Sequence, residues 1–177
     1  MSEVQPIKDK RDIERMKQSL SGRDLLLFIV GINTSLRISD ILELKREDFN
    51  GSHMRLTERK TGKTKTIRIN DALANAVSEL ADDSGYLFKS RKGVDKPISR
   101  VQAYRILNSA AERAGLTINF GTHTLRKTFA YHAYNNGKGC DLALLMRVLN
   151  HSSQRETLRY IGIDQESQDD VYLTVNL

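Results

Sequence analysis

The sequence predicts an α+β fold that is mostly α-helical, with one small antiparallel β-sheet near the end of its first third. Two patterns predict it. Apolar residues recur at helical spacing through most of the chain, whereas residues 54–69 alternate apolar and polar side chains around a turn. A length of 177 residues suits one domain with its own core. We therefore expect a single domain over residues 1–177, with a C-terminal tail from about residue 164.

Three helices are expected before the sheet. Asp9 and Asp12 can cap the first, whose apolar positions have helical spacing. The apolar stretch 25–32 predicts a buried second helix. Ser39 is expected to cap a short third helix, which contains Ile41, Leu42 and Leu44.

The expected sheet is a β-hairpin. Met54 and Leu56 alternate with polar residues, Lys60-Thr61-Gly62-Lys63 supplies a turn, and Ile67 and Ile69 alternate again.

Five further helices are expected after the hairpin. They cover residues 71–81, 99–115, 122–136, 141–150 and a last segment that starts at a capping box of Ser153 and Glu156. Thr122 is the expected cap of the third of these helices, and Gly137 lies past its end. Asn150 can end the fourth, because asparagine tolerates the left-handed conformation. The tail alternates through Val171, Leu173 and Val175, which predicts a strand or a docking segment that regulates assembly.

Composition and charge limit the classes of function. A net charge of +6 and a pI near 9.5 favour an anionic partner such as nucleic acid. Cys140 is the single cysteine, so no intrachain disulfide can form and a cytoplasmic location is expected. The longest apolar run, residues 25–32, is too short to span a bilayer, and no membrane partner is expected. The histidines and Cys140 have no metal-binding spacing, so neither a metal nor another cofactor is expected.

Several polar residues suit phosphodiester chemistry. His123 and Arg126 lie three apart near a helix start, where backbone N–H groups attract phosphate. Arg37 follows the buried helix, and arginine forks bind phosphate oxygens in pairs. His151 lies in a loop between two helices, and Tyr160 follows nine residues later as a possible nucleophile.

The order and spacing of these residues, with a lysine-bearing hairpin between the first two groups, resemble the tyrosine recombinase family. The strings TSLRISDILEL, HTLRKTFA, LNHSS and TLRYIG carry the resemblance, which extends over about residues 8–163. It implies the catalytic-domain fold of that family. It also implies site-specific DNA recombination by an integrase or recombinase of a phage or other mobile element, without metal or ATP.

The resemblance also implies residue roles. Arg37 and Arg126 would bind the scissile phosphate, His123 and His151 would hydrogen-bond its oxygens and assist proton transfer, and Tyr160 would attack to form a 3′-phosphotyrosine. Three positions depart from the family pattern without removing a required group: Ser35, Asn150 and Lys127.

The lysines of the hairpin leave the general acid open. Lys60 resembles the family's general acid, with Lys63 and Lys65 as rivals. Lys63, Lys65 and Lys127 are also expected to bind DNA, and Asp40 resembles the family's supporting acidic residue.

The expected partners are double-stranded DNA and further protomers, four of which would form the synaptic complex. Only about twenty residues precede the buried helix, so an N-terminal DNA-clamping domain is expected to be absent. Two other functions stay open: DNA relaxation like that of a type IB topoisomerase, and a catalytically silent DNA-binding regulator. A phosphate-binding P-loop is rejected because Thr57 stands where its first glycine is needed.

Overall fold

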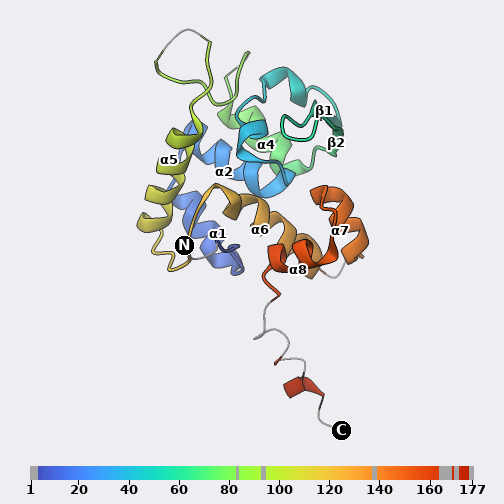
Figure 1. Ribbon diagram of the computed structural model, residues 1–177. Helices are drawn as coiled ribbons and strands as arrows, with labels where there is room; N and C mark the ends of the chain where they lie inside the picture. The colour runs from blue at the N-terminus through green and yellow to red at the C-terminus, as the bar shows by residue number, and fades with distance from the viewer. Residues whose placement is uncertain are drawn as a thin grey trace.

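A computed structural model describes residues 4–82, 84–92, 95–136, 139–163, 169 and 172–175. The described residues are mostly helical, with one two-stranded antiparallel hairpin at one side of the molecule, which confirms the predicted fold class (Figure 1). The elements are α1 (Lys10–Gln18), α2 (Gly22–Thr34), α3 (Ile38–Ile41), the 3₁₀ helix η1 (Arg46–Phe49), β1 (His53–Thr57), β2 (Thr64–Arg68), α4 (Asp71–Leu80), α5 (Arg100–Arg113), α6 (Thr122–Asn135), α7 (Leu142–Leu149) and α8 (Gln154–Ile161). None of the helices in these ranges is long and apolar enough to cross a lipid bilayer.

Helix α2 forms the centre of the main core, as its apolar sequence predicts. Its buried side chains include Leu26, Phe28 and Val30. Helix α6 lies directly against α2, and a Cβ added at Gly31 would collide with the side chain of Leu125. Glycine at this position therefore allows the close approach that fixes α6, the helix of His123 and Arg126, on the core.

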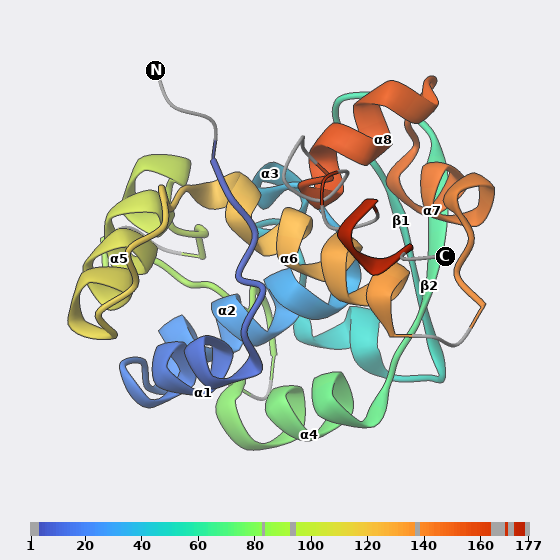
Figure 2. The ribbon, with the colours of Figure 1, turned by 90° about the horizontal axis from the view of Figure 1, so that it is seen from below.

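The hairpin pairs Met54 with Ile67 and Thr57 with Thr64. Met54 is buried and Leu56 is half-buried, whereas the residue between them is exposed. Because side chains alternate between the faces of a strand, the next residue of the inward face is Glu58. Figure 2 shows the hairpin beside α7, and a hydrogen bond from Lys65 Nζ to the carbonyl of Val148 joins the two elements.

A second, smaller core holds the end of the chain against α6. Its buried members are Ala130 of α6, Leu145 and Leu149 of α7, and Ile161 of α8. This packing fixes the loop that carries His151 and the helix that carries Tyr160 next to α6.

Most predicted helix ends are confirmed. The side chains of Asp9, Ser99, Asp141 and Ser153 cap their helices, and Asn150 ends α7 in the left-handed conformation with φ of 57°.

Two predicted caps were wrong. The N-cap of α3 is Arg37 rather than Ser39, because the carbonyl of Arg37 accepts the N–H groups of Asp40 and Ile41. Helix α3 ends at Ile41, so Leu42 is its C-cap and Leu44 lies beyond it. Helix α6 begins at Thr122, and its N-cap is Gly121, whose N–H donates to the hydroxyl of Thr124.

The predicted strand in the tail was also wrong at Leu173. Residues 172–174 form a helical turn with exposed side chains, and Val175 is exposed after it. A strand needs an edge to pair with, whereas a helical turn bonds within itself. Val171 and Gly137 lie outside the described residues.

Candidate active site

Arg37 is positioned by the turn that leaves α2. Ser35 adopts the left-handed conformation with φ of 57°, and the chain then enters α3 at Arg37. The Arg37 side chain is 18% exposed, and its Nη1 donates to Glu58 Oε2 at 3.1 Å. One edge of this guanidinium is therefore held by the protein.

Arg126 lies one turn after His123 on α6 and is buried. Its Nη2 donates to the carbonyl of Leu149 at the end of α7. Its Nη1 is buried and has no hydrogen-bond partner among the described residues. A buried, charged N–H group without a partner is costly, so this position favours an anionic ligand.

The loop after α7 brings His151 to the same place. Its Nδ1 lies 3.0 Å from the hydroxyl of Thr157, which is buried in α8. Its Nε2 lies 3.7 Å from Glu156 Oε1. Burial lowers the pKa of His151, and the nearby Glu156 carboxylate opposes part of that change.

Tyr160 meets both histidines. The phenolic oxygen lies 3.3 Å from His123 Nδ1, and the Tyr160 and His151 rings pack edge to face with centroids 4.9 Å apart. The guanidinium carbon of Arg126 is 6.0 Å from the centre of the Tyr160 ring. His123, Arg126 and His151 therefore converge on the phenol of Tyr160.

The surroundings shift the pKa values of Tyr160 and His123 in opposite directions. Burial raises the pKa of Tyr160, although the Arg126 cation opposes the change. Part of the His123 side chain faces solvent. Burial of the rest of the imidazole lowers the pKa of His123, and the Arg126 cation lowers it further. Near neutral pH the pair is a phenol beside a neutral imidazole, which can accept the phenolic proton.

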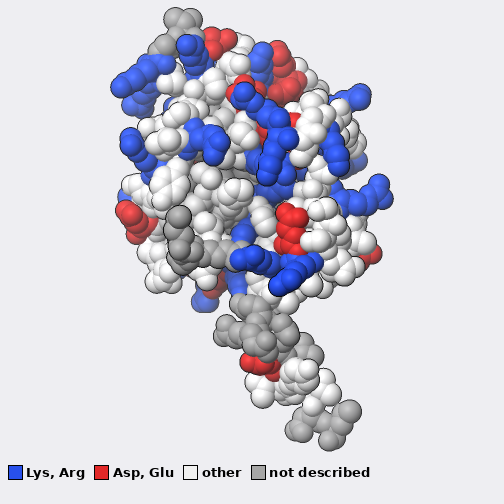
Figure 3. Space-filling model, in the orientation of Figure 1, with Lys and Arg blue, Asp and Glu red and all other residues white. Residues whose placement is uncertain are grey.

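A cavity of about 560 Å³ lies beside Arg37, His123 and Arg126. Five of its ten lining residues are basic, and none of the ten is acidic. Figure 3, in the orientation of Figure 1, shows several Lys and Arg side chains near the middle of the face that it draws. The lining residues are Leu36, Arg37, Ile38, Ser39, Arg59, Lys60, Arg100, Thr122, His123 and Arg126. Arg59 and Arg100 were not predicted, since nothing in their local sequence marks them.

The three hairpin lysines have different surroundings. Lys60 is exposed in the turn and lines the cavity. Lys63 is exposed and donates to Asn150 Oδ1 at 3.1 Å. Lys65 turns inward and donates to Ser35 Oγ at 2.8 Å and to the Val148 carbonyl at 2.7 Å. Burial, together with the Arg126 cation, lowers the pKa of Lys65 to about 8.

Two other predicted residues are also buried. Lys127 is not on an open DNA-facing surface: its Nζ lies 5.3 Å from the centre of the Tyr160 ring. Asp40 accepts the N–H of Arg59 at 3.0 Å, and thereby holds the backbone just before Lys60. For Lys65 and Lys127, this geometry favours a role inside the site over direct contact with DNA.

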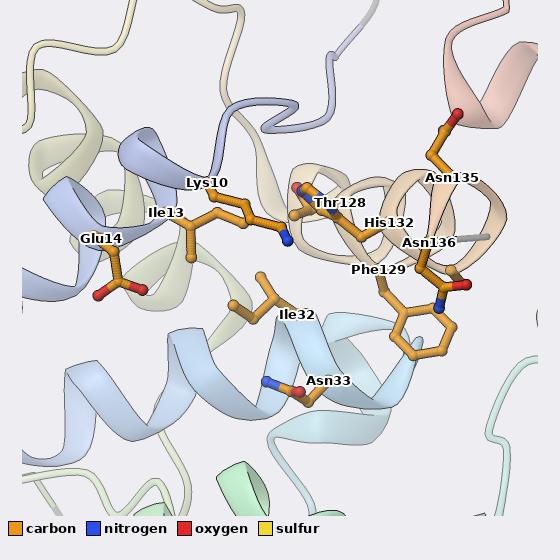
Figure 4. Close-up of a pocket in the computed structure, with 11 residues that line it drawn as sticks. Lys10, Ile13, Glu14, Ile32, Asn33, Thr128, Phe129, His132, Asn135 and Asn136 are labelled. Carbon is orange, nitrogen blue, oxygen red and sulfur yellow. The ribbon is translucent and has the colours of Figure 1, made fainter. Parts of the chain in front are cut away.

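A second groove, of about 600 Å³, lies between α1, α2 and α6 (Figure 4). His132, Phe129 and Ile13 are among its lining residues, and it contains none of the predicted site residues. No group of three or more His, Cys, Asp or Glu side chains within the described ranges is arranged to hold a metal ion.

Glu58 lies next to the site but belongs to none of the sequence motifs that predicted it. It is buried next to Arg37, and the alternation of Met54 and Leu56 would have placed it on the inward face.

The chain is similar in sequence to known integrases and recombinases. Residues 5–167 match the model of the phage integrase family. The chain is 49% identical over 176 residues to YoeC of Bacillus subtilis (strain 168), described as a probable integrase/recombinase, and covers 95% of it. It is 32% identical over 162 residues to the tyrosine recombinase XerA of Pyrococcus furiosus, but spans only 55% of that protein.

A solved structure agrees with these relatives. The catalytic domain of bacteriophage HP1 integrase aligns with a TM-score of 0.67 at 25% identity, over 99% of this chain and 97% of that domain. Three findings indicate the same family: the fold, the match over residues 5–167 and the relative at 49% identity. The chain belongs to the phage integrase family.

Proposed function

We propose that this chain is a site-specific tyrosine recombinase, which cuts and rejoins double-stranded DNA through a 3′-phosphotyrosine at Tyr160. The observation that carries the proposal is the buried Arg126 Nη1, which lacks a partner among the described residues beside the phenol of Tyr160. A phosphate placed there would accept from Arg126 and from the free edge of Arg37.

The cleavage step follows from these positions. The Tyr160 oxygen attacks phosphorus, its proton passes to His123, and the bond from phosphorus to the 5′ oxygen breaks. Lys60, in the cavity, donates a proton to the departing 5′ oxygen. His151, beside Tyr160, adds a hydrogen bond to the phosphate.

Rejoining is the reverse of cleavage. One phosphodiester becomes one phosphotyrosine ester, so the energy of the broken bond is conserved and ATP is not required. A 5′-hydroxyl from a partner strand then attacks phosphorus and releases Tyr160. Exchange of both strands of two duplexes needs four breaks, and each chain supplies one Tyr160. We therefore propose that four protomers act together on DNA, as in the λ integrase tetramer bound to a Holliday junction.

A DNA substrate and the single Cys140 both favour a cytoplasmic location.

A selection for covalent attachment tests the proposal and identifies the target sequence at the same time. The chain is incubated with a library of nicked duplexes of random sequence, the mixture is denatured, and the DNA attached to protein is sequenced. A recombinase predicts attached strands that share one sequence and end in a 3′-phosphotyrosine. Attachment to many unrelated sequences, with relaxation of supercoiled plasmid, would instead indicate a topoisomerase. Absence of any attached DNA would indicate a silent DNA-binding protein.

A further inference from the structure

Glu58 is a buried acidic residue just beyond the end of β1. It is 1% exposed, on the inward face that Met54 and Leu56 begin. A carboxylate is rarely buried to this degree unless charged or hydrogen-bonding groups surround it. Glu58 has such groups, and they come from three separate segments of the chain.

One oxygen of Glu58 receives all three contacts. Oε2 accepts from Arg37 Nη1 at 3.1 Å, from Thr61 Oγ1 at 2.8 Å and from Asn150 Nδ2 at 3.2 Å. Burial works against ionisation, but the hydrogen bonds from Thr61 and Asn150 and the Arg37 cation outweigh it and lower the pKa of Glu58. The side chain is therefore a carboxylate at neutral pH.

Each contact lies at or next to a residue of the cleavage step. Arg37 itself lines the cavity. Thr61 follows Lys60 directly, and the Glu58 carbonyl also accepts the N–H of Gly62 at 2.8 Å, so the turn is held on both sides of Thr61. Asn150 precedes His151 in the chain.

The Asn150 contact has a fixed direction. Its Oδ1 accepts from Lys63, so its Nδ2 is the group that donates to Glu58. The left-handed backbone of Asn150 ends α7 and starts the loop of His151. The Asn150 side chain thus ties the hairpin to the α7–α8 loop, next to the contact of Lys65 with the Val148 carbonyl of α7.

We propose that Glu58 is a positioning residue for DNA cleavage, which holds Arg37, the Lys60 turn and the His151 loop in one arrangement without touching DNA. The inference rests on the proposed function. Arg37 gives one nitrogen to Glu58, and its other edge stays available to the phosphate. Without Glu58, these three segments lose their common anchor, and the reacting groups lose alignment, to which rates are very sensitive.

The negative charge of Glu58 makes it possible to distinguish a positioning role from a role in DNA binding. The Glu58 carboxylate lies beside Arg37 and opposes the positive field of the cavity. Its neutralisation should not weaken attraction to DNA, because it removes a negative charge. A defect confined to the chemical step is therefore the specific signature of a positioning role, which simple loss of structure would not produce.

The test compares Glu58→Gln and Glu58→Asp with wild type and with a matched control, Glu47→Gln, which neutralises an exposed carboxylate of η1. The substrate is a nicked duplex recovered by the selection for covalent attachment. Two quantities are measured for each protein: the single-turnover rate of adduct formation at saturating DNA, and the Kd for the same duplex.

Glu58→Gln is expected to slow adduct formation by at least about 10-fold, with a Kd that is unchanged or lower. Glu58→Asp keeps the charge but is one methylene shorter, so it should recover part of the rate. Glu47→Gln should match wild type. A wild-type rate in Glu58→Gln, or a slow rate with an equally weakened Kd, overturns the proposal. Failure of wild type to form any adduct would instead overturn the proposed function.

A double-mutant cycle keeps the test open if Glu58→Gln does not fold. Thr61→Val and Asn150→Ala each remove one donor to Glu58 and leave the carboxylate in place. Both single variants should slow adduct formation without raising the Kd, and the double variant should deviate from the product of the two effects. Wild-type rates in all three variants overturn the proposal.

Discussion

The Nδ1 atom of His123 lies 3.3 Å from the phenolic oxygen of Tyr160. The pKa of His123 is lowered and that of Tyr160 is raised, so the proton rests on Tyr160 and the imidazole is free to take it. The same distance would deliver the proton back when Tyr160 leaves during rejoining. The contact therefore sets an expected pH dependence for both directions of the reaction.

Single-turnover cleavage should lose rate as the pH falls below neutrality. Protonation of His123 removes the acceptor for the Tyr160 proton, and its pKa lies below the usual value of 6.5. The rate should stay level from about pH 8 to 7 and fall with a midpoint below 6.5. His123→Gln should remove this acid limb, whereas His151→Gln should lower the rate and keep the limb. A midpoint above 6.5 would contradict the predicted direction of the shift.

Cleavage should persist in excess EDTA. Arg37 and Arg126 supply the positive charge that a metal ion would otherwise provide to the phosphate. Arg126→Ala should slow the chemical step by roughly 100-fold or more, the scale of removing one preorganised donor. The measurement is the adduct rate with EDTA and after addition of Mg²⁺. An absolute requirement for Mg²⁺ would contradict the mechanism.

The general acid can be identified from the leaving group. Lys60→Ala should slow cleavage of ordinary DNA by about 100-fold or more, because the 5′ oxygen then leaves without a proton. A substrate with sulfur in place of that bridging oxygen should restore the rate, because a thiolate leaves without protonation.

Lys65→Met is the matched comparison for that experiment. Lys65 binds Ser35 and the Val148 carbonyl, so its loss should slow both substrates equally. Rescue of Lys65→Met but not of Lys60→Ala would assign the acid to Lys65, whose pKa of about 8 suits proton donation.

This 177-residue chain, tested by itself, should bind DNA weakly. Residues 5–167 match one family domain, which would contact the duplex from one side, so about half of the phosphate contacts of a two-domain clamp would be missing when these residues are tested by themselves. Each missing contact should reduce the slope of log Kd against log salt by about 0.9. The Kd for the selected duplex is measured at several salt concentrations. Nanomolar binding with a steep salt dependence would show that this chain makes a full set of contacts.

The fold and the main site were predictable for different reasons. Helices and hairpin follow from periodicity, which the core enforces, as with Met54 opposite Ile67. The strings around Arg37, His123, His151 and Tyr160 indicated a common site, although periodicity alone does not bring separate segments together. In the structure Arg37 and His123 line one cavity, and His123 and His151 contact the phenol of Tyr160, while their catalytic roles stay predictions.

Lysine orientation could not be predicted from the hairpin sequence. Lys60, Lys63 and Lys65 have similar sequence surroundings in the hairpin. A long flexible side chain, however, takes its direction from its tertiary partners. Lys65 turns inward because the Val148 carbonyl at the end of α7 and Ser35 Oγ lie within its reach. The start of α3 was misplaced for a related reason. Serine is a preferred N-cap residue, so Ser39 looked like a better cap than Arg37, but the chain direction after Ser35 decides the first helical residue.

The central claim is that Tyr160 is the nucleophile, and Tyr160→Phe tests it most directly. This change removes only the phenolic oxygen and keeps the ring that packs against His151. Wild type and variant are incubated with the selected nicked duplex, and a denaturing gel is used to detect the protein–DNA species. The account predicts a slow-migrating adduct for wild type, no adduct for Tyr160→Phe, and nearly equal Kd values for both. Equal adduct from the variant would contradict it and assign the nucleophile to another tyrosine, such as Tyr131 or Tyr134.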